Sequence, residues 1–289
     1  MNGPPGRLVV CPTPIGNLGD VSERVLGELR AADLIACEDT RRTRVLLERY
    51  GIARPTVSLH EHNEAARSAK LVERALAGER VAVVSDAGMP TISDPGARLV
   101  SAALRAGVRV EVLPGPSAVT TAVAASGLAA GGFVFGGFLP RGAARMRAEV
   151  ERLDAAGLPL VAFESPKRLP ATLRALAAVW PDRPAAVCRE LTKLHEQIER
   201  GPLRELAETF AEAPRGEITL VLAPVPPQPA DVDLDALAEL AEALGTRRAA
   251  DLAARLTGAS RNALYEAVTA RKAPRWPDRP GNRGTPSGP

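Results

Sequence analysis

The sequence is poor in aromatic residues: two Trp, two Tyr and five Phe supply only 3% of 289 residues. Recognition of a splayed nucleic-acid base on an aromatic platform is therefore less favoured than recognition through phosphates and backbone groups. Cysteine is scarce as well. Cys11, Cys37 and Cys188 are widely spaced and form no CxxC pair, which argues against a disulfide framework and against a zinc site. We predict buried, reduced thiols and no bound metal.

Long apolar runs are also missing. No stretch reaches transmembrane length, and the amino terminus has no signal-peptide pattern. These absences predict a cytoplasmic protein that has no membrane partner. The composition that remains, 45% hydrophobic and 25% charged, is typical of globular proteins, and the length suits two domains with an appendage.

Short apolar runs alternate with helical patterns through most of the chain, a rhythm that predicts α/β structure. In the first half, which we expect to form a largely parallel sheet, the runs are 8–11, 34–37, 56–59, 81–85 and 108–113. In the second half they are 133–138, 158–163, 185–188, 197–199 and 217–222. We therefore predict one α/β domain at residues 1–115 and a second at 116–223.

A proline-rich stretch at 224–233 predicts a stiff, extended linker. Three helical patterns follow between 234 and 271, with Ser260 as the expected N-cap of the last, in the proportions of a helix-turn-helix. The remaining residues, 272–289, are rich in Pro, Gly and Arg, and we predict a disordered tail.

Three loops follow predicted strands of the first domain, at 12–20, 85–96 and 113–118. Each has a structural explanation when taken alone: chain reversal for the first, and helix N-caps at Asp94 and Ser117 for the others. For Asp94 alone we favour the N-cap. Because carboxyl ends of parallel strands meet at one sheet edge, the three loops together indicate a ligand site. They match neither the P-loop nor GxGxxG, which disfavours a nucleoside triphosphate.

A series of short motifs carries a family resemblance. They are PTPIGNL at 12–18, EDTR at 38–41, SLHEHN at 58–63, SDAGMPTISDPG at 85–96, PGPSA at 114–118, FESPKR at 163–168, RELTK at 189–193, HE at 195–196 and GE at 216–217. With these motifs the chain resembles the tetrapyrrole methylase superfamily, and within it the branch that methylates ribosomal RNA of the small subunit. The resemblance spans residues 8 to about 223, and the helical appendage fits the same branch.

The resemblance implies two αβα domains with a cleft between them that binds S-adenosylmethionine, usually in a homodimer. The implied substrate is a cytidine in the decoding region of 16S rRNA, methylated at its ribose 2′-hydroxyl within the small ribosomal subunit. The implied cofactor contacts, many of them through backbone groups, are Pro12, Gly16, Asn17, Asp86, Ala87, Gly88, Ile92, Ser117, Ala118, Phe163, Glu164, Leu191, Gly216, Glu217 and Ile218.

A ribose hydroxyl is a weak nucleophile, so a proton acceptor or a cation near the developing alkoxide would assist methyl transfer. Our candidate catalytic residues are Glu38, Asp39, Lys193 and Glu196. Further candidate bases are Glu190, His60, His62 and His195, with Arg41 as an orienting cation. For each of these side chains, a salt bridge or a solvent-exposed role is the alternative.

Basic clusters supply candidate RNA contacts. We assign Arg41, Arg42, Arg44, Lys167 and Arg168 to RNA phosphates. A solvated helix face is the alternative for the arginines at 41–44, and we favour it for the cluster at Arg141, Arg145 and Arg147. The last helices, with Arg247, Arg248 and Arg255, fit either an RNA-binding unit or a small structural bundle.

Two other functions remain open. A C-methyltransferase acting on a tetrapyrrole, of the uroporphyrinogen or precorrin type, would share the cleft and the cofactor. The EDTR and ESPKR motifs and the helical appendage speak against it. A non-enzymatic helix-turn-helix protein that binds nucleic acid would leave the three loops of the first domain without a purpose.

Overall fold

Parallel strands form the first sheet because the aliphatic runs of its central strands are buried on both faces and its strands are joined by helices. The structure, a computed structural model, describes residues 6–129, 131–225, 232–257 and 259–272. The strand order is β3-β2-β4-β1-β5, and every pair is parallel. The strands are β1 (Arg7–Val10), β2 (Leu34–Cys37), β3 (Thr56–Ser58), β4 (Arg80–Val84) and β5 (Arg109–Val112).

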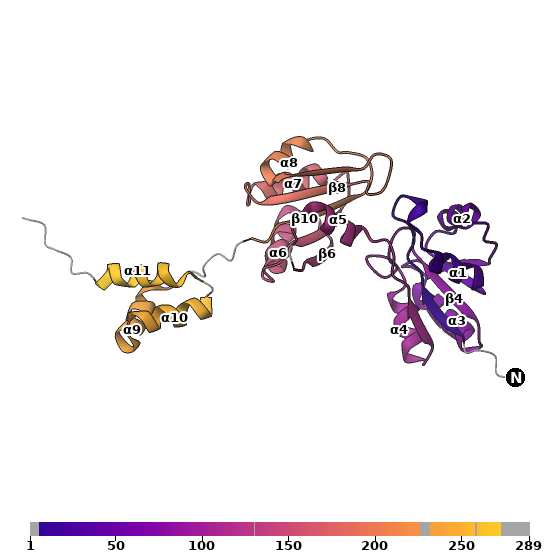
Figure 1. Ribbon diagram of the computed structural model, residues 1–289, viewed down its shortest axis with the longest axis horizontal. Helices are drawn as coiled ribbons and strands as arrows, with labels where there is room; N and C mark the ends of the chain where they lie inside the picture. The colour runs from indigo at the N-terminus through magenta and orange to yellow at the C-terminus, as the bar shows by residue number, and fades with distance from the viewer. Residues whose placement is uncertain (1–5, 130, 226–231, 258, 273–289) are drawn as a thin grey trace, which may run out of the picture. The chain divides into compact units, whose positions relative to one another are not determined.

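Helices cover both faces of this sheet (Figure 1). They are η1 (Leu18–Asp20), α1 (Glu23–Ala31), α2 (Thr40–Arg49), α3 (Glu64–Leu76) and α4 (Ala97–Arg105). One core cluster joins α1 and α2 to Val9 and Ile35, and another joins α3 and α4 to Leu8 and Val81. Leu8 and Val9 are neighbours on β1, and side chains of neighbouring strand residues point to opposite faces of a sheet. Helices α1 and α2 therefore cover one face, and α3 and α4 cover the other.

The adjacent strands β1 and β4 lead into helices on opposite faces of the sheet. In open α/β sheets this reversal opens a crevice beyond the carboxyl ends of the two strands. The loops that begin at Cys11 and at Ser85 therefore flank the expected ligand position.

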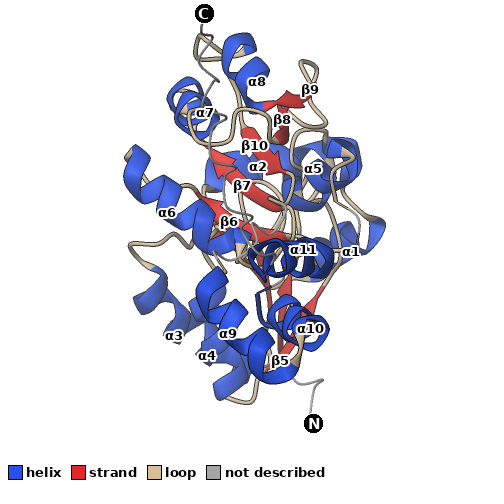
Figure 2. Cartoon of the chain, turned by 90° about the vertical axis from the view of Figure 1, so that its left-hand side faces the viewer, coloured by secondary structure: helices blue, strands red, loops and turns tan. Residues whose placement is uncertain are grey.

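The second sheet is mixed, with the order β6-β7-β10-β8-β9, which Figure 2 shows as red strands in that sequence. Only β6 and β7 are parallel; β10 runs antiparallel to both of its neighbours, and β9 runs antiparallel to β8. The strands are β6 (Val134–Phe138), β7 (Leu160–Glu164), β8 (Pro184–Arg189), β9 (Gln197–Pro202) and β10 (Ile218–Leu222). The apolar runs predicted for this half therefore all form strands.

Helices also cover both faces of the second sheet. One face packs on α5 (Ala118–Ser126), through Val119 and Ala122. The other packs on α6 (Ala143–Asp154), α7 (Leu169–Ala177) and α8 (Leu203–Thr209). The predicted α/β fold class, two αβα sandwiches followed by a small helical unit, is confirmed.

The chain separates into two compact units, Met1–Pro224 and Val225–Pro289. The second contains α9 (Leu234–Leu244), α10 (Thr246–Thr257) and α11 (Arg261–Lys272) around a core that includes Leu237, Ala250 and Val268. Ser260 precedes α11, and its Oγ accepts from the Ala263 N–H at 3.5 Å. The finer domain boundaries stay predictions. The predicted tail and most of the predicted linker lie outside the described residues.

Two simpler expectations concern burial and membranes. Cys11, Cys37 and Cys188 are all buried and free, and burial raises the pKa of Cys11 to about 12 and that of Cys188 to about 11. Such thiols are protonated packing groups rather than nucleophiles. Within the described ranges, no helix is both long and apolar enough to cross a membrane.

Candidate functional site

A cavity of about 410 Å³ lies beyond the carboxyl ends of β1 and β4 and reaches β7 and β10 of the second sheet. Its size is within the range of small-molecule sites, and its lining is mostly apolar, as is usual for them. The residues lining it are Ile15, Ala87, Gly88, Met89, Ile92, Ser93, Asp94, Ser117, Ala118, Val119, Phe138, Phe163, Glu164, Ser165, Pro166, Gly216, Glu217, Ile218 and Thr219.

Hydrogen bonds tie the loop after β1 to the loop after β4. Thr13 and Gly88 form a two-way backbone bridge, with N···O distances of 2.9 and 3.0 Å, and the Thr13 hydroxyl donates to the Ser85 carbonyl at 3.0 Å. Gly88 has φ +84, where side chains are strained, and a Cβ there would lie 3.3 Å from Ile15 Cγ2. The cavity wall at Gly88 is thus bare backbone held in place.

The loop after β1 also contacts the loop between β8 and β9. Gly16 lies so close to this loop that a Cβ would be 2.4 Å from Lys193 Cγ and 2.9 Å from the Leu191 carbonyl. The Asn17 N–H donates to Thr192 Oγ1 at 3.1 Å. This contact joins a loop of the first sheet to a loop of the second within the Met1–Pro224 unit.

Asp94 is the cavity carboxyl with the largest change in acidity. Its pKa rises to about 7, mainly because the carboxyl group is buried. A hydrogen bond with Ser85 lowers the pKa and offsets part of this rise. The negative charges of Glu38, Asp86 and Glu217 add to the rise. The N-cap role that we favoured for Asp94 is wrong: α4 begins at Ala97 with Gly96, at φ +121, in the cap position.

Glu164 is a second cavity carboxyl, and its side chain is fully buried. Its Oε1 accepts from the Ser165 N–H at 2.6 Å and its Oε2 from the Thr172 hydroxyl at 2.6 Å. Arg168 Nη2 lies 3.2 Å from Oε2. The buried charge is therefore paired and hydrogen-bonded, as a buried carboxylate must be.

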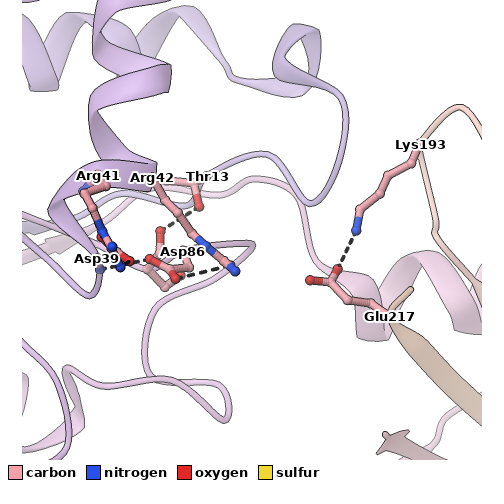
Figure 3. Close-up of polar contacts among 8 residues, drawn as sticks. Thr13, Asp39, Arg41, Arg42, Asp86, Lys193 and Glu217 are labelled. Carbon is pink, nitrogen blue, oxygen red and sulfur yellow. Dashed lines mark hydrogen bonds and ion pairs between the residues drawn. The ribbon is translucent and has the colours of Figure 1, made fainter. Parts of the chain in front are cut away.

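Two groups of charged side chains adjoin the cavity (Figure 3). In the first, Asp86 accepts from the Asp39 N–H at 3.0 Å and pairs with Arg42 at 3.3 Å. Asp39 caps α2 and forms a two-bond pair with Arg41, whose hydrogen bonds lower the pKa of Asp39 to about 2.

In the second group, Lys193 Nζ donates to Glu190 at 2.7 Å and to Glu217 at 3.0 Å. Burial works against the charge of Lys193, but these two bonds raise its pKa above the usual value. Gly216 makes room for the pair, since a Cβ there would lie 2.3 Å from Glu190 Cγ. Lys193 is thus held against Glu217, which lines the cavity.

Most of the residues predicted to contact the cofactor line this one cavity: Ala87, Gly88, Ile92, Ser117, Ala118, Phe163, Glu164, Gly216, Glu217 and Ile218. The others lie beside it and support it. The Pro12 ring lies against Gly115, Gly16 and Asn17 contact the loop at 191–193, Asp86 holds Asp39 and Arg42, and Leu191 is buried in the core beside α5. Their roles stay predictions.

The candidate catalytic residues are not among those that line the cavity. Glu38 lies nearby, and its pKa is raised by burial and by the charge of Asp86. Glu196 accepts from the Thr192 N–H at 2.7 Å and supports the 190–196 loop. The sequence interpretation missed Asp94 as a candidate, although it is the second acidic residue of the SDAGMPTISDPG motif. It also missed Phe138, for which no motif gives a signal.

The residues assigned to RNA differ in what they contact. Arg41, Arg42 and Arg168 are engaged by Asp39, Asp86 and Glu164. Arg44 and Lys167 are exposed, and no ion pair is found for either among the described residues. Arg44 and Lys167 are therefore better placed than the other three to contact an external phosphate.

Comparison with known proteins adds the family. The profile of Tetrapyrrole (Corrin/Porphyrin) Methylases matches residues 7–207, and that of the RsmI C-terminal HTH domain matches 226–272. A solved structure, uroporphyrin-III C-methyltransferase from Thermus thermophilus complexed with S-adenyl homocysteine, has a TM-score of 0.54 at 19% identity, over 75% of this chain and 97% of that chain. At this identity the likeness shows the fold alone.

The fold and the cavity thus define an S-adenosylmethionine-dependent methyltransferase of the tetrapyrrole methylase class. Ribosomal RNA small subunit methyltransferase I of Mesorhizobium japonicum is 45% identical over 264 residues, 89% of this chain and 90% of that protein. The protein of that name from Thermotoga maritima is 47% identical over 218 residues, 75% of this chain and 98% of that protein. The chain belongs to the ribosomal RNA small subunit methyltransferase I family.

Proposed function

We propose that this protein transfers a methyl group from S-adenosylmethionine to the ribose 2′-hydroxyl of a cytidine in the decoding region of small-subunit ribosomal RNA. The observation that carries the proposal is the cavity, which the loops of the family motifs line. The chain is also 45% identical to a relative named ribosomal RNA small subunit methyltransferase I. The name of this relative specifies neither a cytidine nor the 2′-oxygen, and these two parts of the proposal rest on the motif resemblance.

The residues of the cavity fit the cofactor. S-adenosylmethionine is a cation with a long organic frame, and it supplies an electrophilic methyl group on its sulfonium. Apolar groups such as Ile15 and Phe163 offer contact area, and the bare wall at Gly88 allows close approach. The carboxyls of Asp94 and Glu217 favour a positive charge in the cavity.

Methyl transfer to a ribose needs alignment of the hydroxyl and removal of its proton. We propose Asp94 as the group that accepts this proton, because it lines the cavity and its pKa is close to working pH. The bound cofactor would supply the methyl group, its carbon–sulfur bond breaking with both electrons going to sulfur, which leaves as a neutral thioether. The carboxylate of Asp94 would take the proton that O2′ gives up as it bonds to the methyl carbon. The apolar walls exclude water from this step.

The candidate catalytic residues named from the sequence then take supporting roles in the proposal. Burial is the main reason that the pKa of Asp94 is high, and the charge of Glu38 adds to the rise. Lys193 positions Glu217, and Glu196 holds the 190–196 loop through Thr192. Asp39, with a pKa of about 2, is too weak a base to take a proton from a hydroxyl.

For substrate binding, we retain Arg41, Arg42, Arg44, Lys167 and Arg168 as proposed contacts to RNA phosphates. We also propose that the protein acts as a homodimer and in the cytoplasm, where small ribosomal subunits are found. A tetrapyrrole substrate is less favoured, since the solved structures of uroporphyrin-III C-methyltransferase are only 19% to 21% identical to this chain. A purely nucleic-acid-binding function leaves the cavity unused.

The test is transfer of labelled methyl groups from S-adenosylmethionine to small subunits that lack the modification, followed by mass spectrometry of the nucleosides. We expect 2′-O-methylcytidine, and no transfer to subunits that already carry it. Label in another nucleoside would contradict the proposed acceptor. Label in uroporphyrinogen III and none in RNA would replace the proposal with the tetrapyrrole alternative.

A further inference from the structure

A second cavity, of about 550 Å³, lies between the start of α6 and one side of α7. We call it the α6–α7 groove. Ser165 lines both this groove and the cofactor cavity, so the two are neighbours. Its lining residues are Pro140, Arg141, Gly142, Ala143, Met146, Ser165, Lys167, Arg168, Ala171, Thr172 and Ala175.

The rim of this groove carries positive charge without counter-charge. Arg141 and Lys167 line it and are exposed, and among the described residues neither forms an ion pair. The amino end of α6 also faces this region, with Gly142 in the cap position and no side-chain cap bond. Helix amino ends and unpaired cations both favour an anion, and here they adjoin.

Arg168 differs from these two cations because it is partnered within the protein and holds the walls of the groove together. Its Nη2 donates to the Leu139 carbonyl at 2.8 Å and the Pro140 carbonyl at 3.1 Å. It also pairs with the buried Glu164 at 3.2 Å. These contacts fix the backbone segment that carries Arg141 against the segment that carries Lys167, so the two free cations extend from neighbouring, fixed positions.

The interior of the groove is apolar, with Met146, Ala171 and Ala175 beside the cationic rim. A nucleotide in a strand matches this combination, since its phosphate is anionic and its sugar has apolar faces. We propose that the α6–α7 groove binds the phosphodiester backbone of the RNA strand next to the methylated nucleotide, with Arg141 and Lys167 contacting the phosphate. This inference rests on the proposed function, because the neighbouring cavity must receive a ribose of the same strand.

The test measures binding and methyl transfer for the double variant Arg141→Ala, Lys167→Ala at several salt concentrations. Arg174→Ala is the matched control, since it removes an exposed cation from α7 that does not line the groove. The probes are unmodified small subunits and protein-free 16S rRNA, with S-adenosylmethionine affinity as a check on the fold.

For the double variant we expect the KM for subunits to rise about tenfold, at unchanged cofactor affinity. The slope of log affinity for 16S rRNA against log salt should fall by about 2, one for each lost phosphate contact. Arg174→Ala should change neither. An unaltered salt slope would overturn the proposal, as would weaker binding to subunits with normal binding to 16S rRNA, which indicates a ribosomal protein in the groove.

If the wild-type protein binds S-adenosylmethionine but methylates no small subunit, the proposed function fails and the groove proposal falls with it. If the wild type methylates subunits and the double variant behaves like Arg174→Ala, only the groove proposal fails. The two failures are thus distinguished by the wild-type arm.

Discussion

Asp94 is the proposed proton acceptor: it lines the cavity, and the charges of Glu38, Asp86 and Glu217 act on its carboxyl group. Only its deprotonated form accepts a proton, so the rate should rise as pH passes through the pKa, which is about 7 without ligand. A cationic cofactor stabilises the carboxylate, and we expect the midpoint to move below that value at saturating S-adenosylmethionine.

Asp94→Asn tests this role. We expect kcat to fall by about 10²-fold, the lower end of the effect of a general base. The rise with pH should disappear, while S-adenosylmethionine affinity changes little because the amide keeps the shape of the side chain. The measurement is a pH profile of single-turnover methyl transfer together with calorimetric binding of the cofactor.

Glu38→Gln is the control for that experiment. Glu38 acts on Asp94 through charge, so its removal should lower the midpoint of the pH profile and keep the transition. If Glu38→Gln removes the transition and Asp94→Asn leaves it in place, the proton acceptor is Glu38 and the assignment of Asp94 is refuted.

Gly88 is the residue at which backbone conformation and cavity shape coincide. Gly88→Val should abolish S-adenosylmethionine binding, because its Cβ would stand 3.3 Å from Ile15 Cγ2 and its branches would enter the cavity. Gly51→Val is the matched control: Gly51 has φ +62 and open space around it, so it carries similar backbone strain away from the cavity. Normal cofactor affinity in folded Gly88→Val would remove Gly88 from the site.

At the residue scale, the sequence predicted which glycines lie at the cavity better than it predicted the chemical role of the side chains. Gly88 lies in a loop that follows a predicted strand, and Gly216 was named through the family resemblance; both line the cavity. Asp94 was interpreted as a helix cap because its sequence neighbours allow that role. Its raised pKa depends first on burial and then on the charges of residues 38, 86 and 217, which surround it only in the folded chain.

At the scale of elements, runs of aliphatic and β-branched residues predicted the strands within a few residues. The parallel order of the first sheet followed from strands that alternate with helices. The mixed order of the second did not follow, since β10 is buried on both faces and reads like a parallel strand while pairing antiparallel to β7 and β8. The pattern of burial does not record strand direction.

A buried ion pair connects the elements of the second sheet. Arg183 and Asp154 meet in a two-bond pair at 2.6 and 2.8 Å, with side chains 3% and 10% exposed. Arg183 also donates to the Ala223 carbonyl at 2.8 Å. The pair therefore holds the end of α6 and the chain that follows β10 to the start of β8.

Asp154→Ala should lower the free energy of unfolding by about 3 kcal/mol, because it leaves a buried guanidinium without its counter-charge. Glu149→Ala, which breaks the exposed pair with Arg152 on the same helix, should have no measurable effect. Chemical denaturation of both variants measures the difference. Equal losses would mean that the buried pair contributes no more than a surface pair.

At the scale of the whole molecule, the residues that line the cofactor cavity all fall in the unit Met1–Pro224. The Thermotoga maritima relative supports the separation of roles, since 218 residues of this chain cover 98% of it. That length matches the first unit without the helical unit. We therefore predict that the first unit binds the cofactor without the helical unit, whose exposed Arg247 and Arg248 offer positive charge to RNA phosphates.

A chain that ends at Pro224 tests this division. We expect it to fold and to bind S-adenosylmethionine as the full chain does, because the cavity keeps every lining residue. Its kcat on small subunits should be unchanged and its KM raised, since the removed unit carries exposed cations such as Arg247 and Arg248 but no cavity residue. Lost cofactor binding in a folded truncation would show that the helical unit completes the cavity. An unchanged KM would show that the unit makes no contact with the subunit, and its basic residues would then serve only its own solubility.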